Sequence, residues 1–238
     1  VSDFHFAELV RSHFDCTIAL INDIDAQAVG EQKLGAGKGI DHLVYLYVGH
    51  GIGAGIIING QLYTGSNHLA AEIGHMSINY DGQLCKCEHG IGCLESLSSK
   101  LAIVQAIQSA YQHGEQTTLA EHLSKDPLDL SAAKLADAIE QQDPLTMRIV
   151  TEAAEAFGAG IANVVNFLNP HVIVLGGDVV DEIDLFCDLA IASARRRSLP
   201  SSLQDMSIVR GGLGTTAGAY GAAVFAKQYI AQMRQRAE

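Results

Sequence analysis

The chain contains no tryptophan, only four prolines and few basic residues, with 15 Lys and Arg against 27 Asp and Glu. The resulting formal net charge of −12 repels phosphate backbones, so we do not expect this chain by itself to bind nucleic acid. The one basic run, Arg195-Arg196-Arg197, is short and is expected to lie at the C-terminus of a helix. We find no signal peptide and no apolar run long enough to span a bilayer, so we expect a cytoplasmic protein.

Cysteine is present in an odd number, five, and three of the five lie within nine residues. This pattern argues against a disulfide framework and favours a reducing compartment with metal chemistry. The length of 238 residues, the 48% apolar content and the 24 glycines are typical of a soluble α/β protein with one large domain or two small lobes.

The cysteines belong to the most distinctive stretch, Glu72 to Glu95, with the sequence EIGHMSINYDGQLCKCEHGIGCLE. His75, Cys85, Cys87 and Cys93 have the ligand types that Zn²⁺ prefers, and three Cys with one His form a common structural site. The alternative is a loop with three small buried thiols, because free Cys is often buried. The tight spacing on a polar, glycine-rich loop favours a zinc-binding loop over residues 72–95.

Hydrophobic periodicity predicts strands alternating with helices, and hence a three-layer α/β arrangement. Asn59-Gly60 predicts a hairpin turn, Ser131 a helix N-cap and Pro170 the end of a long helix. The strands are expected at residues 16–21, 43–48, 55–59, 61–63, 171–175 and 206–210. The helices are expected from about 3 to 14, after 22–23, around 97–107, at 132–141, 145–168 and 182–197, and from the last glycine-rich segment to about 234.

Three further groups of residues are candidates for ligand contacts. The glycines of Gly49 to Gly55, GHGIGAG, allow a backbone to approach a phosphate or a sugar hydroxyl, or serve only a tight hairpin turn. Asn22-Asp23 follows an expected strand, where ligand contacts cluster in α/β folds, but both residue types also make good helix N-caps. Glu72 and Glu95 bracket the metal loop, and a bound zinc would hold their carboxylates in place.

Several motifs together resemble the ROK family of sugar kinases and sugar-responsive repressors: NDID at Asn22, the GHGIGAG segment, AAEIGHM at Ala70, the C-x-C…GC-LE pattern and the late VIVLGGD. The resemblance extends over nearly the whole chain. It implies an actin-like (ribonuclease H-like) α/β fold with a sugar bound between two lobes. It also implies that His75, Cys85, Cys87 and Cys93 hold a structural zinc, and that sugar hydroxyls contact Asn22, Asp23, Glu72, His75 and Glu95.

In the family's kinases the position of Asp23 is the catalytic base, and ATP with Mg²⁺ is the second substrate. The same resemblance assigns the phosphate and nucleotide contacts to Gly49, His50, Gly51, Gly53, Gly176 and Gly177.

The chain departs from the family pattern in three respects. The first phosphate loop, of the Asp-x-Gly-Gly-Thr kind, has no match, so we expect residues 1–238 to be a fragment with an incomplete N-terminal lobe. His50 stands where the second phosphate loop usually has Thr. The segment from Cys87 to Cys93 is one residue longer than in the family, with Glu88 in place of Gly, and His89 becomes a candidate substitute ligand.

Three functions therefore remain open. The first, which His50 favours because a regulator need not hold ATP, is the sugar-binding part of a transcriptional regulator, with DNA contacted through a helix-turn-helix segment outside this chain. The second is an ATP-dependent sugar kinase, in which Asp23 would deprotonate a sugar hydroxyl; lacking the first phosphate loop, this fragment would be inactive. The third is a zinc-stapled oligomerisation module. Family members tend to form dimers or larger assemblies, so a homodimer or homotetramer is expected, while residue types alone do not name the sugar.

Overall fold

The computed structural model describes residues 6–82, 84–85, 87, 90–123 and 130–237. The strands are β1 (Leu43–Val48), β2 (Ile52–Ile58), β3 (Gln61–Tyr63), β4 (Val172–Gly176) and β5 (Ser207–Arg210). The α-helices are α1 (Phe6–Arg11), α2 (Asp23–Leu34), α3 (Glu95–Ser98), α4 (Lys100–Gln112), α5 (Ala120–Leu123), α6 (Ala132–Glu140), α7 (Pro144–Leu168), α8 (Asp178–Glu182), α9 (Asp184–Arg197) and α10 (Ala217–Ala237). Short 3₁₀ turns are η1 (Ile73–His75), η3 (Pro200–Leu203) and η4 (Gly214–Thr216).

The five strands form one mixed sheet in the order β3-β2-β1-β4-β5. The first three are an antiparallel meander, and β1, β4 and β5 run parallel. Because β1 and β4 are parallel, their carboxyl ends lie at the same edge of the sheet, where the loops after both strands meet. This edge carries the candidate site.

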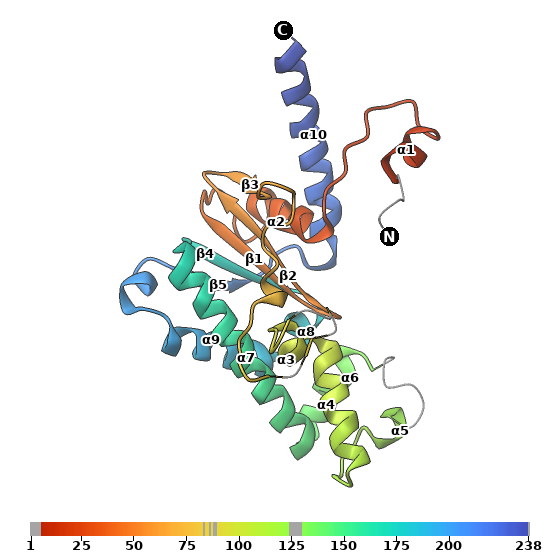
Figure 1. The fold of residues 1–238 in the computed structure, drawn as a ribbon, viewed down its shortest axis with the longest axis vertical. Helices are drawn as coiled ribbons and strands as arrows, with labels where there is room; N and C mark the ends of the chain where they lie inside the picture. The colour runs from red at the N-terminus through yellow and green to blue at the C-terminus, as the bar shows by residue number, and fades with distance from the viewer. Residues whose placement is uncertain (1–5, 83, 86, 88–89, 124–129, 238) are drawn as a thin grey trace.

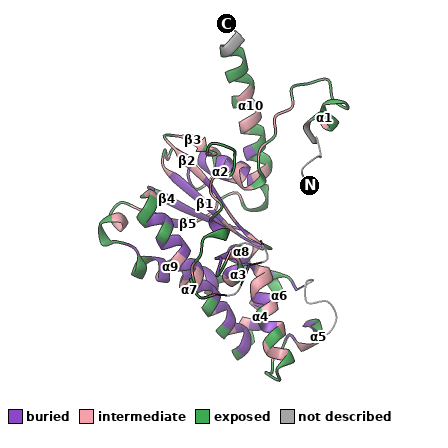
Figure 2. Ribbon diagram, viewed as in Figure 1, coloured by how far each residue is buried: buried purple, intermediate pink, exposed green. Residues whose placement is uncertain are grey.

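Helices cover both faces of the sheet, which confirms the expected three-layer α/β arrangement (Figure 1). Alternate residues of β1 point to opposite faces, as the two-residue period of a strand requires. Val44, Leu46 and Val48 join the core under α7 and α9, and Leu43 and Tyr45 join the core under α2. The central strands and the inner side of α7 are buried, whereas α1 and the outer half of α10 are largely exposed (Figure 2).

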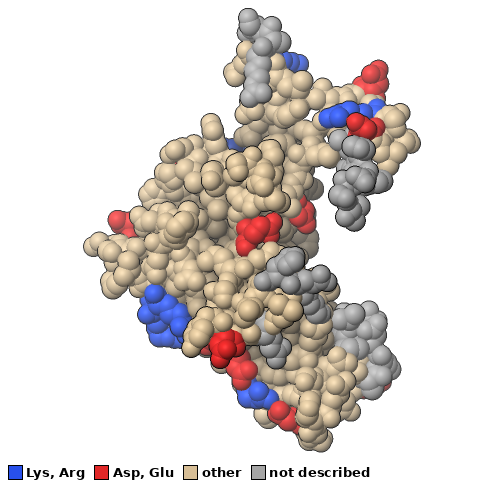
Figure 3. Space-filling model, viewed as in Figure 1, with Lys and Arg blue, Asp and Glu red and all other residues tan. Residues whose placement is uncertain are grey.

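Most of the predicted elements are confirmed, with shifts at their ends. The Asn59-Gly60 turn has positive φ at both residues, 52° and 73°. Ser131 caps α6 by accepting a hydrogen bond from the Lys134 amide. The expected helix around 97–107 is divided at Ser99, whose extended backbone (φ −69°, ψ 158°) and side-chain hydroxyl begin α4. Arg195-Arg196-Arg197 forms the last turn of α9, and the blue patch at the left of Figure 3 lies over this helix.

The predicted strand at residues 16–21 is wrong, because this segment has no regular secondary structure and pairs with no described strand. A run of β-forming residues becomes a strand only beside a partner that accepts its backbone hydrogen bonds. The strand predicted at 55–59 begins earlier, at Ile52. Its glycines permit close packing of α2: a Cβ on Gly55 would lie 2.5 Å from the Cβ of Ala28.

Candidate functional site

The predicted metal ligands come from three short segments that hydrogen bonds bring together. His75 ends η1, Cys85 and Cys87 lie in the following loop, and Cys93 stands two residues before α3. The Ile78 amide donates to the Gly92 carbonyl at 2.8 Å, and the Cys85 amide donates to the Gly90 carbonyl at 2.7 Å. The loop thus folds back on itself and joins η1 to the start of α3.

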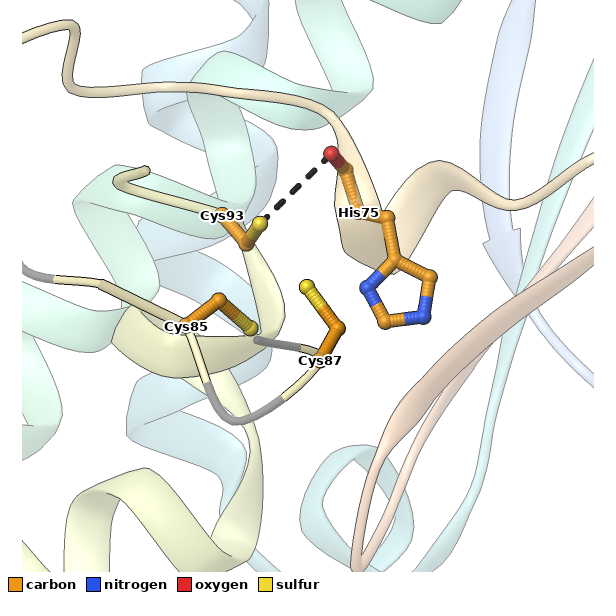
Figure 4. Close-up of side chains that lie close together, drawn as sticks. All are labelled: His75, Cys85, Cys87 and Cys93. Atoms are coloured by element: carbon orange, nitrogen blue, oxygen red, sulfur yellow. Dashed lines mark hydrogen bonds between the residues drawn. The ribbon is translucent and has the colours of Figure 1, made fainter. Parts of the chain in front are cut away.

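The four ligand groups face one another closely enough to hold a metal ion. The His75 ring nitrogen and the three sulfurs all lie within 4.8 Å of one another, and Figure 4 shows them pointing into a shared space. In a tetrahedral site with zinc–sulfur bonds of about 2.3 Å the ligand atoms are about 3.8 Å apart, so a contraction of about 1 Å is sufficient. Cys85 and Cys93 are buried and His75 is exposed.

The surroundings of the sulfurs also fit a cation. The Gly90 amide donates to the Cys87 sulfur at 3.3 Å, a contact typical of a metal-bound thiolate. Burial, together with the neighbouring thiols of Cys85 and Cys87, raises the pKa of Cys93 to about 12. Three sulfurs at this spacing therefore disfavour negative charge until a cation compensates them. Glu88 and His89, including the candidate substitute ligand, lie outside the described residues.

A hollow of about 270 Å³ opens beside this metal cluster, at the edge where β1 ends. Its polar lining consists of Asn22, Asp25, Tyr47, His68, Glu72 and Glu95. Glu72 comes immediately before η1, and Glu95 begins α3, so the segments that supply the metal ligands also position these two carboxylates. The Ile52 amide donates to Glu95 Oε2 at 2.8 Å and fixes that side chain against β2.

The start of α2 forms the opposite wall. Asn22 caps this helix, because its Oδ1 accepts from the amides of Ile24 at 2.9 Å and Asp25 at 3.2 Å. The predicted N-cap is thereby confirmed, and the same residue lines the hollow. Burial, reinforced by the negative charges of Asp23 and Glu72, raises the pKa of Asp25 to about 6.

The hollow gathers three of the five predicted sugar-binding residues: Asn22, Glu72 and Glu95. Asp23 is exposed at the first position of α2, and His75 faces the thiols; neither belongs to the lining. Sequence reasoning missed Asp25, His68 and Tyr47. Asp25 was within reach, since it follows Asp23 by two residues at a helix start, but nothing in the local pattern marks His68.

The glycines predicted to contact phosphate lie at the same edge of the sheet. Gly49, His50 and Gly51 form the turn between β1 and β2, and Gly53 lies within β2. Gly176 is the last residue of β4, and Gly177 follows it before α8. Protein atoms occupy the space that their missing side chains leave. A Cβ would lie 2.5 Å from the Tyr47 hydroxyl at Gly49, 2.6 Å from Glu95 Oε2 at Gly51, and 2.3 Å from the Val48 carbonyl oxygen at Gly177.

Comparison with known proteins identifies the relatives of this chain. The family model described as "ROK family" matches residues 1–229. The chain belongs to the ROK family. A xylose repressor from Caldicellulosiruptor bescii is 29% identical over 201 residues, covering 84% of this chain and 49% of the repressor. A glucokinase from Thermotoga maritima is 30% identical over 213 residues, covering 90% of this chain and 67% of the kinase.

Solved structures similar to this chain include both a regulator and a kinase of the ROK family. A ROK family transcriptional regulator, a homologue of the E. coli MLC protein, superposes with a TM-score of 0.79 at 29% identity, over 90% of this chain and 52% of the regulator. A ROK family glucokinase from Streptomyces griseus, solved with glucose and AMPPNP, gives 0.80 at 31% identity, over 93% of this chain and 72% of the kinase. The expected actin-like fold is therefore confirmed.

This ROK chain spans about half the length of the xylose repressor and two thirds of the length of the Thermotoga glucokinase. No helix in the described residues has the length and apolarity to cross a membrane. Family membership leaves repressor and kinase as two distinct possibilities, which the chemistry of the site must separate.

Proposed function

We propose that this chain binds a small uncharged sugar in the hollow beside the metal cluster and is the effector-binding part of a ROK-type transcriptional regulator. The lining carries the proposal: it includes the carboxylates of Asp25, Glu72 and Glu95 and contains no Lys or Arg among the described residues. Ionised carboxylates only accept hydrogen bonds, and sugar hydroxyls are donors that suit them. The same negative field disfavours a phosphorylated ligand.

The glycine turns support a regulator over a kinase. Phosphoryl transfer relies on cations and backbone amides around the transferred phosphate. Here the space at Gly49, Gly51 and Gly177 is taken by oxygen atoms of Tyr47, Glu95 and Val48. His50, in the same turn, is exposed and bulky where close approach of a phosphate favours a small residue.

The metal cluster has a structural role in this proposal. We infer that His75, Cys85, Cys87 and Cys93 hold Zn²⁺, because three thiols and one imidazole are a preferred zinc set. Glu72 lies three residues before His75 and Glu95 two residues after Cys93, so the ion would fix the spacing of the two carboxylates. His75 would then be a metal ligand that holds Glu72 in position. Asp23 would lie outside the hollow and raise the pKa of Asp25 through its negative charge.

In the whole protein, sugar binding would change DNA affinity through a segment that this chain does not include. A xylose repressor and a ROK transcriptional regulator among its relatives support that setting. Reduced thiols at the metal site fit the cytoplasm, and a homodimer or homotetramer would place two or more sugar sites in one assembly.

The second candidate is a sugar kinase that uses ATP and Mg²⁺. The observation in its favour is coverage: the chain matches more of a glucokinase, 67%, than of a repressor, 49%. In that case exposed Asp23, beside the hollow at the start of α2, would be the base that accepts the proton of the sugar hydroxyl.

A thermal-shift screen with glucose, N-acetylglucosamine and xylose, each with and without Mg-ATP, separates the two functions. The regulator proposal predicts stabilisation by at least one sugar alone, no further shift with ATP and no ADP formation. Glu72→Gln should lose most of the shift, whereas Asp188→Asn, which removes the same charge from an exposed position on α9, should keep it. Stabilisation by ATP without sugar, or ADP formation that depends on sugar, contradicts the proposal.

A further inference from the structure

Three segments far apart in sequence meet next to the glycine turns. The amide of Lys100, the first residue of α4, donates to the Gly49 carbonyl at 2.8 Å. Gly177, with φ of +100°, packs against the Val48 carbonyl and leads into α8. The side chains of Lys100 and Asp178 form an ion pair across this junction, with 21% and 37% of their side-chain surface exposed. The pair therefore links the start of α4 to the turn that follows β4.

The position of Lys100 attracts a negative charge. The N-terminus of a helix carries positive partial charge, so acidic groups stabilise it and a lysine there does not. In α4, a helix of 13 residues, the ammonium group of Lys100 adds to that positive end. A helix N-terminus combined with a lysine beside a glycine turn is a combination that accepts phosphate in other proteins. In this chain the carboxylate of Asp178 supplies the negative charge.

The carboxylate fills that role incompletely. Lys100 pairs with Asp178 Oδ2, whereas Oδ1 is buried and has no hydrogen-bond partner in the described part of the chain. A buried acceptor without a donor is unfavourable. The unpaired Oδ1 is explained if the Asp178 carboxylate occupies this position for its negative charge and not for its hydrogen bonds. The negative charge of Asp178 also acts on a residue of the hollow. The pKa of Tyr47, which lines the hollow, is raised mainly by burial and next by Asp178.

We propose that the Asp178 carboxylate is an internal anion that takes the phosphate-accepting position at Lys100 and the N-terminus of α4, and thereby excludes nucleotide phosphates from the glycine turns. The inference rests on the proposed function, because a kinase needs these turns for ATP. In this proposal the Lys100–Asp178 pair determines which class of ligand binds. Uncharged sugars enter the hollow, and anions are kept out of the adjacent position.

The test is a calorimetric titration of the whole chain with inorganic phosphate, at ionic strength held constant with chloride. Asp178→Ala should bind phosphate at least about fivefold more tightly than the unaltered chain, and fivefold corresponds to about 1 kcal/mol. The isosteric variant Asp178→Asn should also bind phosphate more tightly than the unaltered chain. It replaces Asp178→Ala in the test if the alanine variant does not fold. Adding Lys100→Met to Asp178→Ala should return binding to the original level.

The matched control is Asp184→Ala, which removes another carboxylate from the first residue of a helix, one paired with Arg210 at 2.7 Å. This variant should bind phosphate no better than the unaltered chain. Equal phosphate binding by the unaltered chain and Asp178→Ala, an equal gain in Asp184→Ala, or a gain that survives Lys100→Met overturns the inference. Failure of the sugar proposal is detected separately, since it appears in the sugar titration and not in the phosphate titration.

Discussion

Removal of the zinc ion that we propose at His75, Cys85, Cys87 and Cys93 is the perturbation whose effect can be worked out most fully. Cys93 has 0% of its surface exposed and is one of four ligand groups that lie within 4.8 Å of one another. Cys93→Ser keeps the size of the side chain but replaces a soft thiolate with a hydroxyl that binds zinc poorly. The variant should therefore lose the ion with little direct change in packing.

The expected loss follows from binding linkage. An ion present at 100 times its dissociation constant stabilises the folded state by about 2.7 kcal/mol. For a chain of this size each kcal/mol changes the melting temperature by about 2–4 °C, so metal loss should lower it by roughly 5–10 °C. Chelation of the unaltered chain should have the same effect, and chelation of Cys93→Ser should have almost none.

The assay is differential scanning fluorimetry with and without a zinc chelator, combined with measurement of metal content. Cys187→Ser is the matched control, because Cys187 is also buried, at 1% exposure, but lies outside the cluster and accepts a hydrogen bond from Arg210. It should keep its metal and its full response to chelator. A native chain whose melting temperature ignores the chelator, or equal responses from the two cysteine variants, would refute the reasoning.

Three further predictions concern stability without ligand. Asp25 has a pKa of about 6, above its ordinary value of 3.8, so its contribution to stability is present at low pH and is lost as pH rises through 6. The free energy of unfolding of Asp25→Asn, measured in urea, should therefore rise relative to that of the unaltered chain by about 1 kcal/mol between pH 4 and 7, after allowance for solvent screening. Gly55→Ala should lower the free energy of unfolding by about 1–3 kcal/mol because its Cβ meets Ala28, whereas Gly218→Ala, with 3.6 Å to its nearest neighbour, should be neutral or gain up to about 1 kcal/mol. Burial would raise the pKa of Asp143, but hydrogen bonds from the hydroxyls of Thr117 and Thr146 and from two backbone amides lower it. The contribution of Asp143 to stability is therefore present at neutral pH and lost in acid below its lowered pKa, so Asp143→Ala should cost about 2–3 kcal/mol at pH 7 and less at pH 3, measured by thermal unfolding.

Local patterns predicted the parts of the fold that depend on neighbouring residues. The spacing of Leu145, Ile149 and Phe157 marked α7, and Asn59-Gly60 marked the β2–β3 turn. Residues 16–21 have the composition of a strand, but strand formation depends on a partner that composition does not reveal. The early start of β2 was not predicted because its glycines resemble a turn in the sequence. In the structure they lie in the strand and allow close packing against α2.

The candidate site shows the same division. The metal cluster was predictable, since its ligand types are rare and lie close together in sequence. The hollow joins residues from α2, β1, β2, α3 and the segment that leads into η1. Only the three-dimensional arrangement brings His68 and Tyr47 to it. The Lys100–Asp178 pair spans 78 residues, and no local pattern connects its members.

The most direct test of the central claim compares one uncharged sugar with its phosphorylated form by isothermal titration calorimetry on the metal-loaded chain. The carboxylate-lined hollow should bind the uncharged sugar at least about tenfold more tightly, a difference of about 1.4 kcal/mol. Equal or tighter binding of the phosphorylated sugar, or binding of neither, would contradict a site built from Asp25, Glu72 and Glu95 for sugar hydroxyls.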